Sequence, residues 1–252
     1  MSPEKNDAVI TTEAQVAALN NILAAHGRTA TDVLAGADAV RERATSASPQ
    51  TTEGPYYVDP DADTRQRADI SEGRPGVPLR LRITVLSAEK GAPVPGAVVD
   101  VWHCDALGYY SGHLAHDPDT LPTMDESGHV PPSDESRFLR GCQPTGTDGA
   151  AEFSTIYPGW YFTRSIHIHV KVLVDGREVY TGQLYLPEEY NAAVEGLPPY
   201  NQHITLQRLR NEEDLVYRTA GGEKLLLDVH PVELGQLHRG LTASFTMTVA
   251  IP

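Results

Sequence analysis

The segment that decides the fold reads Arg164-Ser165-Ile166-His167-Ile168-His169-Val170-Lys171-Val172. Isoleucine or valine stands at every second position, which predicts a β-strand with one apolar face. Because side chains alternate across a strand, His167 and His169 point to the opposite face, about 6–7 Å apart. Two imidazoles at this spacing can bind one metal ion. The strand is therefore a candidate metal site.

Tyrosines precede this strand in two motifs, Gly108-Tyr109-Tyr110-Ser111 and Tyr157-Pro158-Gly159-Trp160-Tyr161. Phenolate is a hard anionic oxygen donor that stabilises ferric over ferrous iron, and neutral imidazole is a good iron ligand. Each tyrosine taken alone is more commonly a core or turn residue. Together with the two histidines, however, the tyrosines form a ligand set suited to Fe(III).

From Thr51 onward the chain has the pattern of an all-β domain. Further strands are predicted at residues 79–85, 97–102, 151–156, 179–186, 224–229 and 242–251. The 19 prolines and 21 glycines supply many turns, and Asp175-Gly176 predicts a tight hairpin turn. We therefore expect a mainly β protein, built as an antiparallel β-sandwich with a short N-terminal helical extension.

Residues 11–44 have the only convincing helical pattern, with apolar residues at Val16, Leu19, Ile22 and Leu23. A break at 29–32 divides the pattern into two short helices. We expect residues 1–50 to form a helical arm and linker, and residues 51–252 to form the β-sandwich domain. The helical arm suggests a homodimer.

The formal net charge of −14 argues against nucleic-acid binding, which needs a basic surface. It also gives no reason to expect a membrane partner. The N-terminus lacks the pattern of a signal peptide, and no apolar run approaches the ~20 residues of a transmembrane helix. We expect a cytoplasmic protein, in which Cys104 and Cys142 are free thiols, although their predicted positions on neighbouring strands leave a disulfide open.

Residues 112–136 are rich in His, Asp, Pro and Gly and show no periodicity. A segment of this length inside a compact domain is usually functional, such as a lid, or flexible. It contains His113, His116 and His129. We expect these three to be solvated loop histidines and not metal ligands.

Several spaced motifs together resemble the intradiol ring-cleavage dioxygenases, the family of protocatechuate 3,4-dioxygenase and catechol 1,2-dioxygenase. The resemblance covers roughly residues 51–252. Besides the tyrosine and histidine motifs, it is carried by Glu53-Gly54-Pro55-Tyr56-Tyr57, by Pro95-Gly96-Ala97-Val98-Val99-Asp100-Val101-Trp102-His103, by Thr147-Asp148-Gly149 and by Tyr180-Thr181-Gly182-Gln183-Leu184-Tyr185.

This resemblance implies one non-haem Fe(III) per chain, held by Tyr110, Tyr161, His167 and His169. Tyr110 matches the tyrosine of the family's Gly-x-Tyr-Ser motif, and Tyr161 closes its Pro-Gly-x-Tyr motif. Tyr109 and Tyr157 are the alternative tyrosine ligands, and neither matches the family's ligand positions. Tyr109 would point away from the site of Tyr110 if the segment is extended.

The resemblance also implies that O2 cleaves a catechol-type ring between its two hydroxylated carbons, giving a muconate-type dicarboxylate. Tyr161 is expected to leave the metal when substrate binds and to take up a catechol proton. Arg164 is expected to stabilise negative charge on the ring carbon that O2 attacks. Its odd offset from His167 predicts the opposite strand face, unless the chain bends before Ile166. Gln183 matches a glutamine near the iron, where the resemblance implies a catalytic role as hydrogen-bond donor to the substrate or the bound peroxide; a buried or cross-strand amide is the alternative.

The resemblance places Thr52, Pro55 and Tyr56 in the wall of the substrate pocket. Asp105 and Ala106 are expected to line the same cavity, although a turn role for Asp105 is equally compatible with the sequence. An acidic side chain near the ring would oppose a carboxylated substrate. This favours a neutral catechol or hydroxyquinol.

Two other functions remain open. An Fe(II) oxygenase with two histidines and one carboxylate could use His167, His169 and Asp105, but it leaves the tyrosines unexplained. A catalytically inactive binding module with a structural metal is also compatible with a β-sandwich. Such a module would be expected to lack part of the predicted site, all of which is present.

Overall fold

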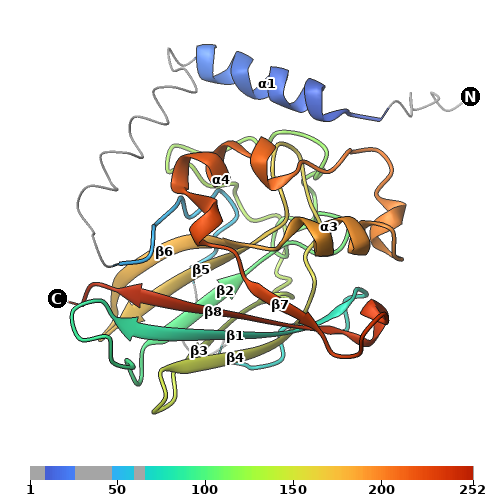
Figure 1. Ribbon diagram of the computed structural model, residues 1–252. Coiled ribbons are helices and arrows are strands. Elements are labelled where there is room, and N and C mark those ends of the chain that lie inside the picture. The colour runs from blue at the N-terminus through green and yellow to red at the C-terminus, as the bar shows by residue number, and fades with distance from the viewer. Residues whose placement is uncertain (1–8, 26–46, 60–65, 252) are drawn as a thin grey trace, which may run out of the picture.

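A computed structural model describes residues 9–25, 47–59 and 66–251. Its centre consists of two four-stranded sheets, with strand orders β4-β1-β8-β7 and β3-β2-β5-β6 (Figure 1). This arrangement confirms the predicted mainly β sandwich.

The first sheet contains β1 (Pro78–Ser87), β4 (Ala150–Ile156), β7 (Asp228–Pro231) and β8 (Leu241–Val249). The second sheet contains β2 (Val98–Trp102), β3 (Arg140–Pro144), β5 (His167–Val174) and β6 (Arg177–Tyr185). The described α-helices are α1 (Thr12–Ala25), α3 (Glu188–Glu195) and α4 (Leu215–Ala220). Short 3-10 turns lie at Tyr200–Gln202, Asn211–Glu213, Gly222–Lys224 and Leu237–Arg239.

One strand pairing departs from the antiparallel prediction. β1 and β8 run parallel, with Leu79 opposite Leu241, whereas the other strand pairs are antiparallel. Parallel neighbours need a long connection between them, and most of the chain separates these two strands. Side-chain alternation shows which residues share a face of a strand but not the direction of the neighbouring strand. The sequence pattern therefore could not predict that β1 and β8 run parallel.

The hairpin of β5 and β6 fixes the position of the histidine strand. Asp175 and Gly176 have φ angles of 51° and 73°, the left-handed backbone that a two-residue Asp-Gly hairpin turn requires. The resulting register sets His169 opposite Gln183. On the other side, β2 sets Trp102 opposite His169.

Both faces of β5 are buried, but in different surroundings. The isoleucines and valines at positions 166–172 belong to the main core, between the two sheets. A second cluster contains Tyr56, Trp102, Cys104, Tyr110, Val130 and Tyr161. The two histidines are in ring contact with members of this second, largely aromatic cluster. The alternation in the strand thus separates apolar packing from a polar site.

Some elements were absent from the sequence prediction. The helices α3 and α4 are only 8 and 6 residues long, too short for a clear helical period. In α3 only Asn191 and Val194 are buried. The strand predicted at 224–229 instead starts at Asp228, after a 3-10 turn.

The first predicted N-terminal helix is present as α1, but its buried face differs from expectation. Val16 is 38% exposed, whereas Gln15 is 1% exposed. The second predicted helix lies outside the described residues. In the described ranges no helix combines the length and apolarity needed to cross a bilayer. Cys104 and Cys142 are free thiols, as predicted.

We predict that Ile83→Ala lowers the free energy of unfolding by about 2–5 kcal/mol, because Ile83 is fully buried in β1 and its loss leaves a cavity. Urea unfolding followed by circular dichroism measures this change. Arg80→Ala, at an exposed position of the same strand, should stay within about 0.5 kcal/mol. Equal losses in the two variants would contradict the placement of the core.

Candidate active site

Four donor atoms of the predicted site converge at one end of β5. The Nε2 atoms of His167 and His169 are 3.0 Å apart. The hydroxyl of Tyr161 lies 3.2 Å from His167 Nε2, and the hydroxyl of Tyr110 lies 3.0 Å from His169 Nε2. All four residues are buried. The structure therefore brings together the complete predicted ligand set.

The loop that carries Tyr110 is shaped by Asp105. Its Oδ1 accepts hydrogen bonds from the backbone N–H groups of Leu107 (2.9 Å) and Tyr109 (3.0 Å). Gly108, with φ of 91°, lies so close to the Trp160 carbonyl that a Cβ would be 2.4 Å from it. The loops that carry the two site tyrosines thus pack directly on each other.

Both histidines are held in position by their neighbours. The Nδ1 atom of His167 is 2.6 Å from the Ser165 carbonyl, so Nδ1 donates its proton there and the lone pair is on Nε2, which faces the Tyr161 hydroxyl. The ring of His169 stacks on Trp102, with centroids 4.9 Å apart and planes at 11°. Gly54 lies against the Cε1 edge of His169.

The electrostatics of the cluster fit a bound cation. Burial lowers the pKa of His167 and His169 well below its ordinary value, which keeps both imidazoles neutral. Burial also raises the pKa of Tyr110, and it raises the pKa of Tyr161 to about 12. Ionised phenolates in these buried surroundings therefore need a compensating positive charge. Two neutral imidazoles and two such phenols fit Fe(III).

Asp105 does not complete a carboxylate triad with the histidines. Its Oδ2 is bound by Arg74, and its contacts are those of a turn residue. Among the described residues no group of three or more His, Cys, Asp or Glu side chains could hold a metal together. The Fe(II) triad hypothesis is thus wrong for this arrangement. Because Arg74 pairs with Asp105, the charge of Asp105 does not disfavour a carboxylated substrate, contrary to expectation.

Arg164 reaches the cluster because the chain turns sharply before β5. Thr163 has a left-handed φ of 66°, and the Arg164 N–H donates to the Tyr161 carbonyl at 3.1 Å. Because of this turn, Arg164 lies on the same side as His167, although its odd offset would place it on the opposite face of a regular strand. Arg164 Nη1 lies 3.4 Å from the Tyr161 hydroxyl.

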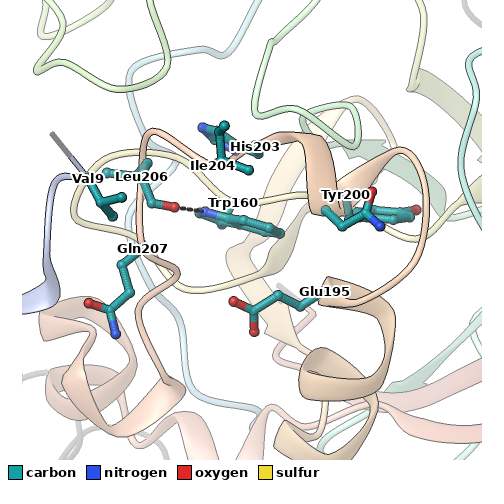
Figure 2. A pocket seen from close by; sticks show the side chains of 9 residues that line it. Val9, Trp160, Glu195, Tyr200, His203, Ile204, Leu206 and Gln207 are labelled. Carbon is teal, nitrogen blue, oxygen red and sulfur yellow. Dashed lines mark hydrogen bonds between the residues drawn. The ribbon is translucent and has the colours of Figure 1, made fainter. Parts of the chain in front are cut away.

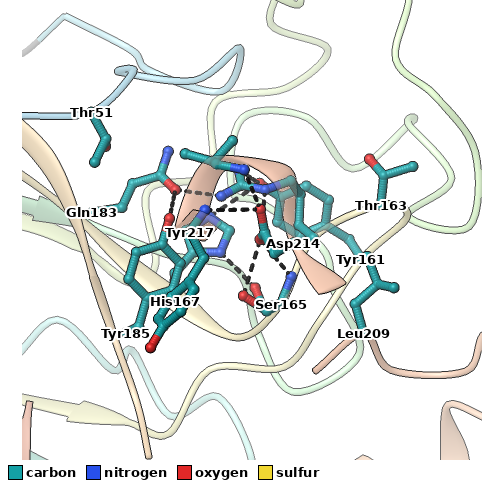
Figure 3. Close-up of polar contacts among 12 residues, drawn as sticks. Thr51, Tyr161, Thr163, Ser165, His167, Gln183, Tyr185, Leu209, Asp214 and Tyr217 are labelled. Carbon is teal, nitrogen blue, oxygen red and sulfur yellow. Dashed lines mark hydrogen bonds and ion pairs between the residues drawn. The ribbon is translucent and has the colours of Figure 1, made fainter. Parts of the chain in front are cut away.

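Sequence reasoning missed Asp214, which is fully buried beside Arg164. Its Oδ2 accepts from Arg164 Nε (3.0 Å), from the Ser165 N–H (2.9 Å) and from Ser165 Oγ (3.0 Å). Its Oδ1 caps α4. Figure 3 shows Asp214 beside Ser165. The only sequence signal was an N-cap residue before a very short helix.

Gln183 connects the arginine to the pocket segment. Its Oε1 accepts from Arg164 Nη2 and from the Tyr185 hydroxyl (3.2 Å). Its Nε2 donates to the Thr52 carbonyl at 3.0 Å. Gln183 is therefore a buried amide that fixes the direction of Arg164.

The predicted pocket residues fall in different places. Tyr56 stacks on Tyr110, with ring centroids 4.5 Å apart, and meets Tyr161 edge-on at 5.8 Å. The Pro55 carbonyl accepts from the Val130 N–H at 2.9 Å. Ala106, in contrast, is packed in the main core.

The expectation of solvated loop histidines is wrong for His113. This side chain is 2% exposed and lies 5.3 Å from the ring of Tyr56, and burial lowers its pKa to about 4. His116 lies 5.7 Å from the same ring and is half-buried. His129 Nε2 is 2.8 Å from Glu53. Burial here depends on the loop folding back onto Tyr56, which no local pattern encodes.

The two rejected tyrosines lie outside the cluster. Tyr157 is buried in the main core, and its hydroxyl donates to Asn191 Oδ1 at 2.7 Å. Tyr109 is half-buried and is not part of the aromatic cluster around Tyr110.

Comparison with known proteins identifies the family. Residues 52–207, more than half of the chain, match the family described as Dioxygenase. A solved intradiol ring-cleavage dioxygenase from Tetranychus urticae is 30% identical with a TM-score of 0.73, covering 81% of this chain and 94% of that one. The chain belongs to the intradiol ring-cleavage dioxygenases.

Curated relatives of this family match over shorter stretches. Catechol 1,2-dioxygenase 1 of Acinetobacter lwoffii is 36% identical over 118 residues, which is 45% of this chain and 32% of the relative. Chlorocatechol 1,2-dioxygenase of Pseudomonas sp. strain P51 is 30% identical over 151 residues, 58% of each chain. The match thus spans between about a third and somewhat over half of these two relatives.

We predict that Gly54→Ala lowers iron affinity by at least about tenfold. The added Cβ would lie 2.8 Å from His169 Cε1, and Trp102 blocks one face of that ring. Iron content after dialysis against a graded chelator measures the loss.

The matched control is Gly73→Ala. Gly73 has a similar φ of 70°, but a Cβ there meets no atom within 4 Å, so this variant shares the backbone cost without the clash. Equal iron retention in both variants would show that Gly54 does not support His169.

Proposed function

We propose that the chain is a non-haem Fe(III) intradiol dioxygenase, which uses O2 to cleave a catechol-type ring between its two hydroxylated carbons and yields a muconate-type dicarboxylate. The convergence of two phenols and two neutral imidazoles, whose donor atoms are linked in sequence by distances of 3.2, 3.0 and 3.0 Å, carries this proposal. Family membership supports the same chemistry. The homodimer and the boundary near residue 50 stay predictions.

Tyr110, Tyr161, His167 and His169 would hold one Fe(III). When bound, the ion would act as a Lewis acid that favours the catechol dianion and makes its ring reactive toward O2. The protein contributes buried, largely aromatic surroundings, in which the ring of Tyr56 lies against both tyrosines and provides a flat aromatic surface. A flat surface of this kind suits an aromatic substrate.

Tyr161 is proposed as the proton acceptor. Released from its ligand role, its oxygen would be a phenolate at a buried position, where burial raises the pKa of this group to about 12. Such a phenolate takes a catechol proton readily and keeps it. Tyr161 therefore both balances charge in the resting state and removes a proton from the substrate.

Arg164 is proposed to stabilise the negative charge that develops on the ring. The adjacent Asp214 carboxylate helps keep its guanidinium charged despite burial. Asp214 and Gln183 occupy Nε and Nη2, and Nη1 is left on the side of Tyr161. The arginine is thus oriented before the substrate arrives.

The substrate class is proposed as catechols without commitment to a ring substituent. The two curated relatives described above are named for catechol and chlorocatechol. Because Arg74 neutralises Asp105, that residue gives no reason to exclude a carboxylated ring.

The function is tested by turnover of catechol, hydroxyquinol and protocatechuate under 18O2. We expect at least one substrate to give a ring-opened dicarboxylate with both labelled atoms incorporated, cleaved between the hydroxylated carbons. Cleavage beside the hydroxyl pair, or incorporation of one label, would contradict the intradiol assignment.

We predict that Tyr161→Phe keeps part of the iron, shifts the visible absorption band and lowers kcat by about 100-fold or more, because it removes one phenolate and the proton acceptor. The matched control is Tyr157→Phe, which removes a buried hydroxyl in the main core. Absorption spectra and oxygen uptake, normalised to iron, measure the effect. A wild-type spectrum and kcat in Tyr161→Phe would remove this residue from the mechanism.

A further inference from the structure

The N-terminal segment is joined to the body of the protein next to the proposed site. The Ile10 N–H donates to the Thr205 carbonyl at 2.8 Å, and the Gln207 N–H donates to the Ile10 carbonyl at 3.0 Å. Residues 205–207 also contact the site loop: the Leu206 carbonyl accepts a hydrogen bond from Trp160 Nε1 at 2.9 Å (Figure 2). Residues 205–207 thus lie between the arm and the residue before Tyr161.

Gln15, in the first turns of α1, reaches past this segment to the site turn. Its Nε2 donates to the Gln207 carbonyl at 2.7 Å, and its Oε1 accepts from the Thr163 N–H at 2.9 Å. The side chain is 1% exposed, although the adjacent Val16 is 38% exposed. A polar residue therefore occupies the buried face of the helix, with both ends of its amide bonded.

The turn that receives this bond is held by its surroundings. Thr163 is a β-branched residue with a φ of 66°, a conformation that such residues rarely adopt. Successive N–H groups at positions 162 to 165 donate to four different segments, namely to Pro118 O, Gln15 Oε1, Tyr161 O and Asp214 Oδ2. Of these four acceptors, Gln15 Oε1 belongs to the N-terminal arm.

We propose that Gln15 is a positioning residue for the Tyr161–Arg164 turn, so that docking of α1 fixes the positions of Tyr161 and Arg164. This inference rests on the proposed function, since it assigns to Tyr161 and Arg164 their roles in ring cleavage. Gln15 touches neither substrate nor reacting atoms. It acts by satisfying a buried N–H in the middle of a turn that carries both residues.

The first test measures the turn without reference to iron or turnover. Hydrogen–deuterium exchange followed by mass spectrometry compares the peptide spanning residues 161–165 in the wild type and in Gln15→Met, which keeps the length of the side chain but removes both bonds. We expect exchange in this peptide to rise by about tenfold or more, because local opening becomes easier. Unchanged exchange would overturn the proposal.

The second test asks whether the bond matters for catalysis. In Gln15→Met we expect the iron-normalised kcat to fall by about tenfold, with KM changed less than about twofold and a shifted visible band, because the turn and not the pocket wall is displaced. Gln15→Glu keeps an acceptor for the Thr163 N–H but loses the donor to the Gln207 carbonyl, so it should retain more of the kcat than Gln15→Met. Gln207→Ala removes the bond that the Thr12 N–H makes to Gln207 Oε1, leaves the turn untouched, and serves as the control for arm docking.

The outcomes separate the two claims. If Gln15→Met loses only thermal stability, with normal spectrum and kcat, the positioning role is wrong and Gln15 is structural. If Gln207→Ala lowers kcat as much as Gln15→Met, general loosening of the arm explains the effect and the proposal fails. If the wild type cleaves no catechol, the proposed function fails, and the exchange result alone decides whether Gln15 holds the turn.

Discussion

The register of β5 between β2 and β6 is the constraint on which the site depends. Because the side-chain period of a strand is two, a slip of one residue would turn both histidines into the main core and expose the isoleucines to the aromatic cluster. The pairing of His169 with Trp102 on one side and Gln183 on the other prevents such a slip. The Asp-Gly turn after β5 fixes the same register from the end of the hairpin.

A second requirement is to keep a positive side chain inside a buried site. An unpaired buried guanidinium would be strongly destabilising, so Arg164 needs Asp214. The same carboxylate binds Ser165 and caps α4, and in this way it ties a distant helix to the turn before β5. Charge balance and backbone geometry are therefore provided by one residue, and the direction of Arg164 follows from it.

The parts of the site that could be predicted are those that depend on local hydrophobic alternation or on short sequence motifs. Alternation predicted the histidine strand, and the family resemblance carried by spaced motifs implied which two tyrosines lie beside it. Asp214 and Gln15 were missed because each acts across a long sequence separation, through hydrogen bonds that no local pattern encodes. The inference from the charge of Asp105 and the expected exposure of His113 were wrong for a related reason. The surroundings of both residues are set by Arg74 and by the fold of residues 112–136 over Tyr56, which only the assembled structure reveals.

The measurement that tests the central claim most directly is a visible absorption spectrum of the purified wild-type protein, with its iron content, before and after anaerobic addition of catechol. We expect about one iron per chain and a strong phenolate-to-Fe(III) charge-transfer band that moves to longer wavelength with catechol. A protein that stays colourless after reconstitution with Fe(III) would contradict the assignment of Tyr110 and Tyr161 as iron ligands.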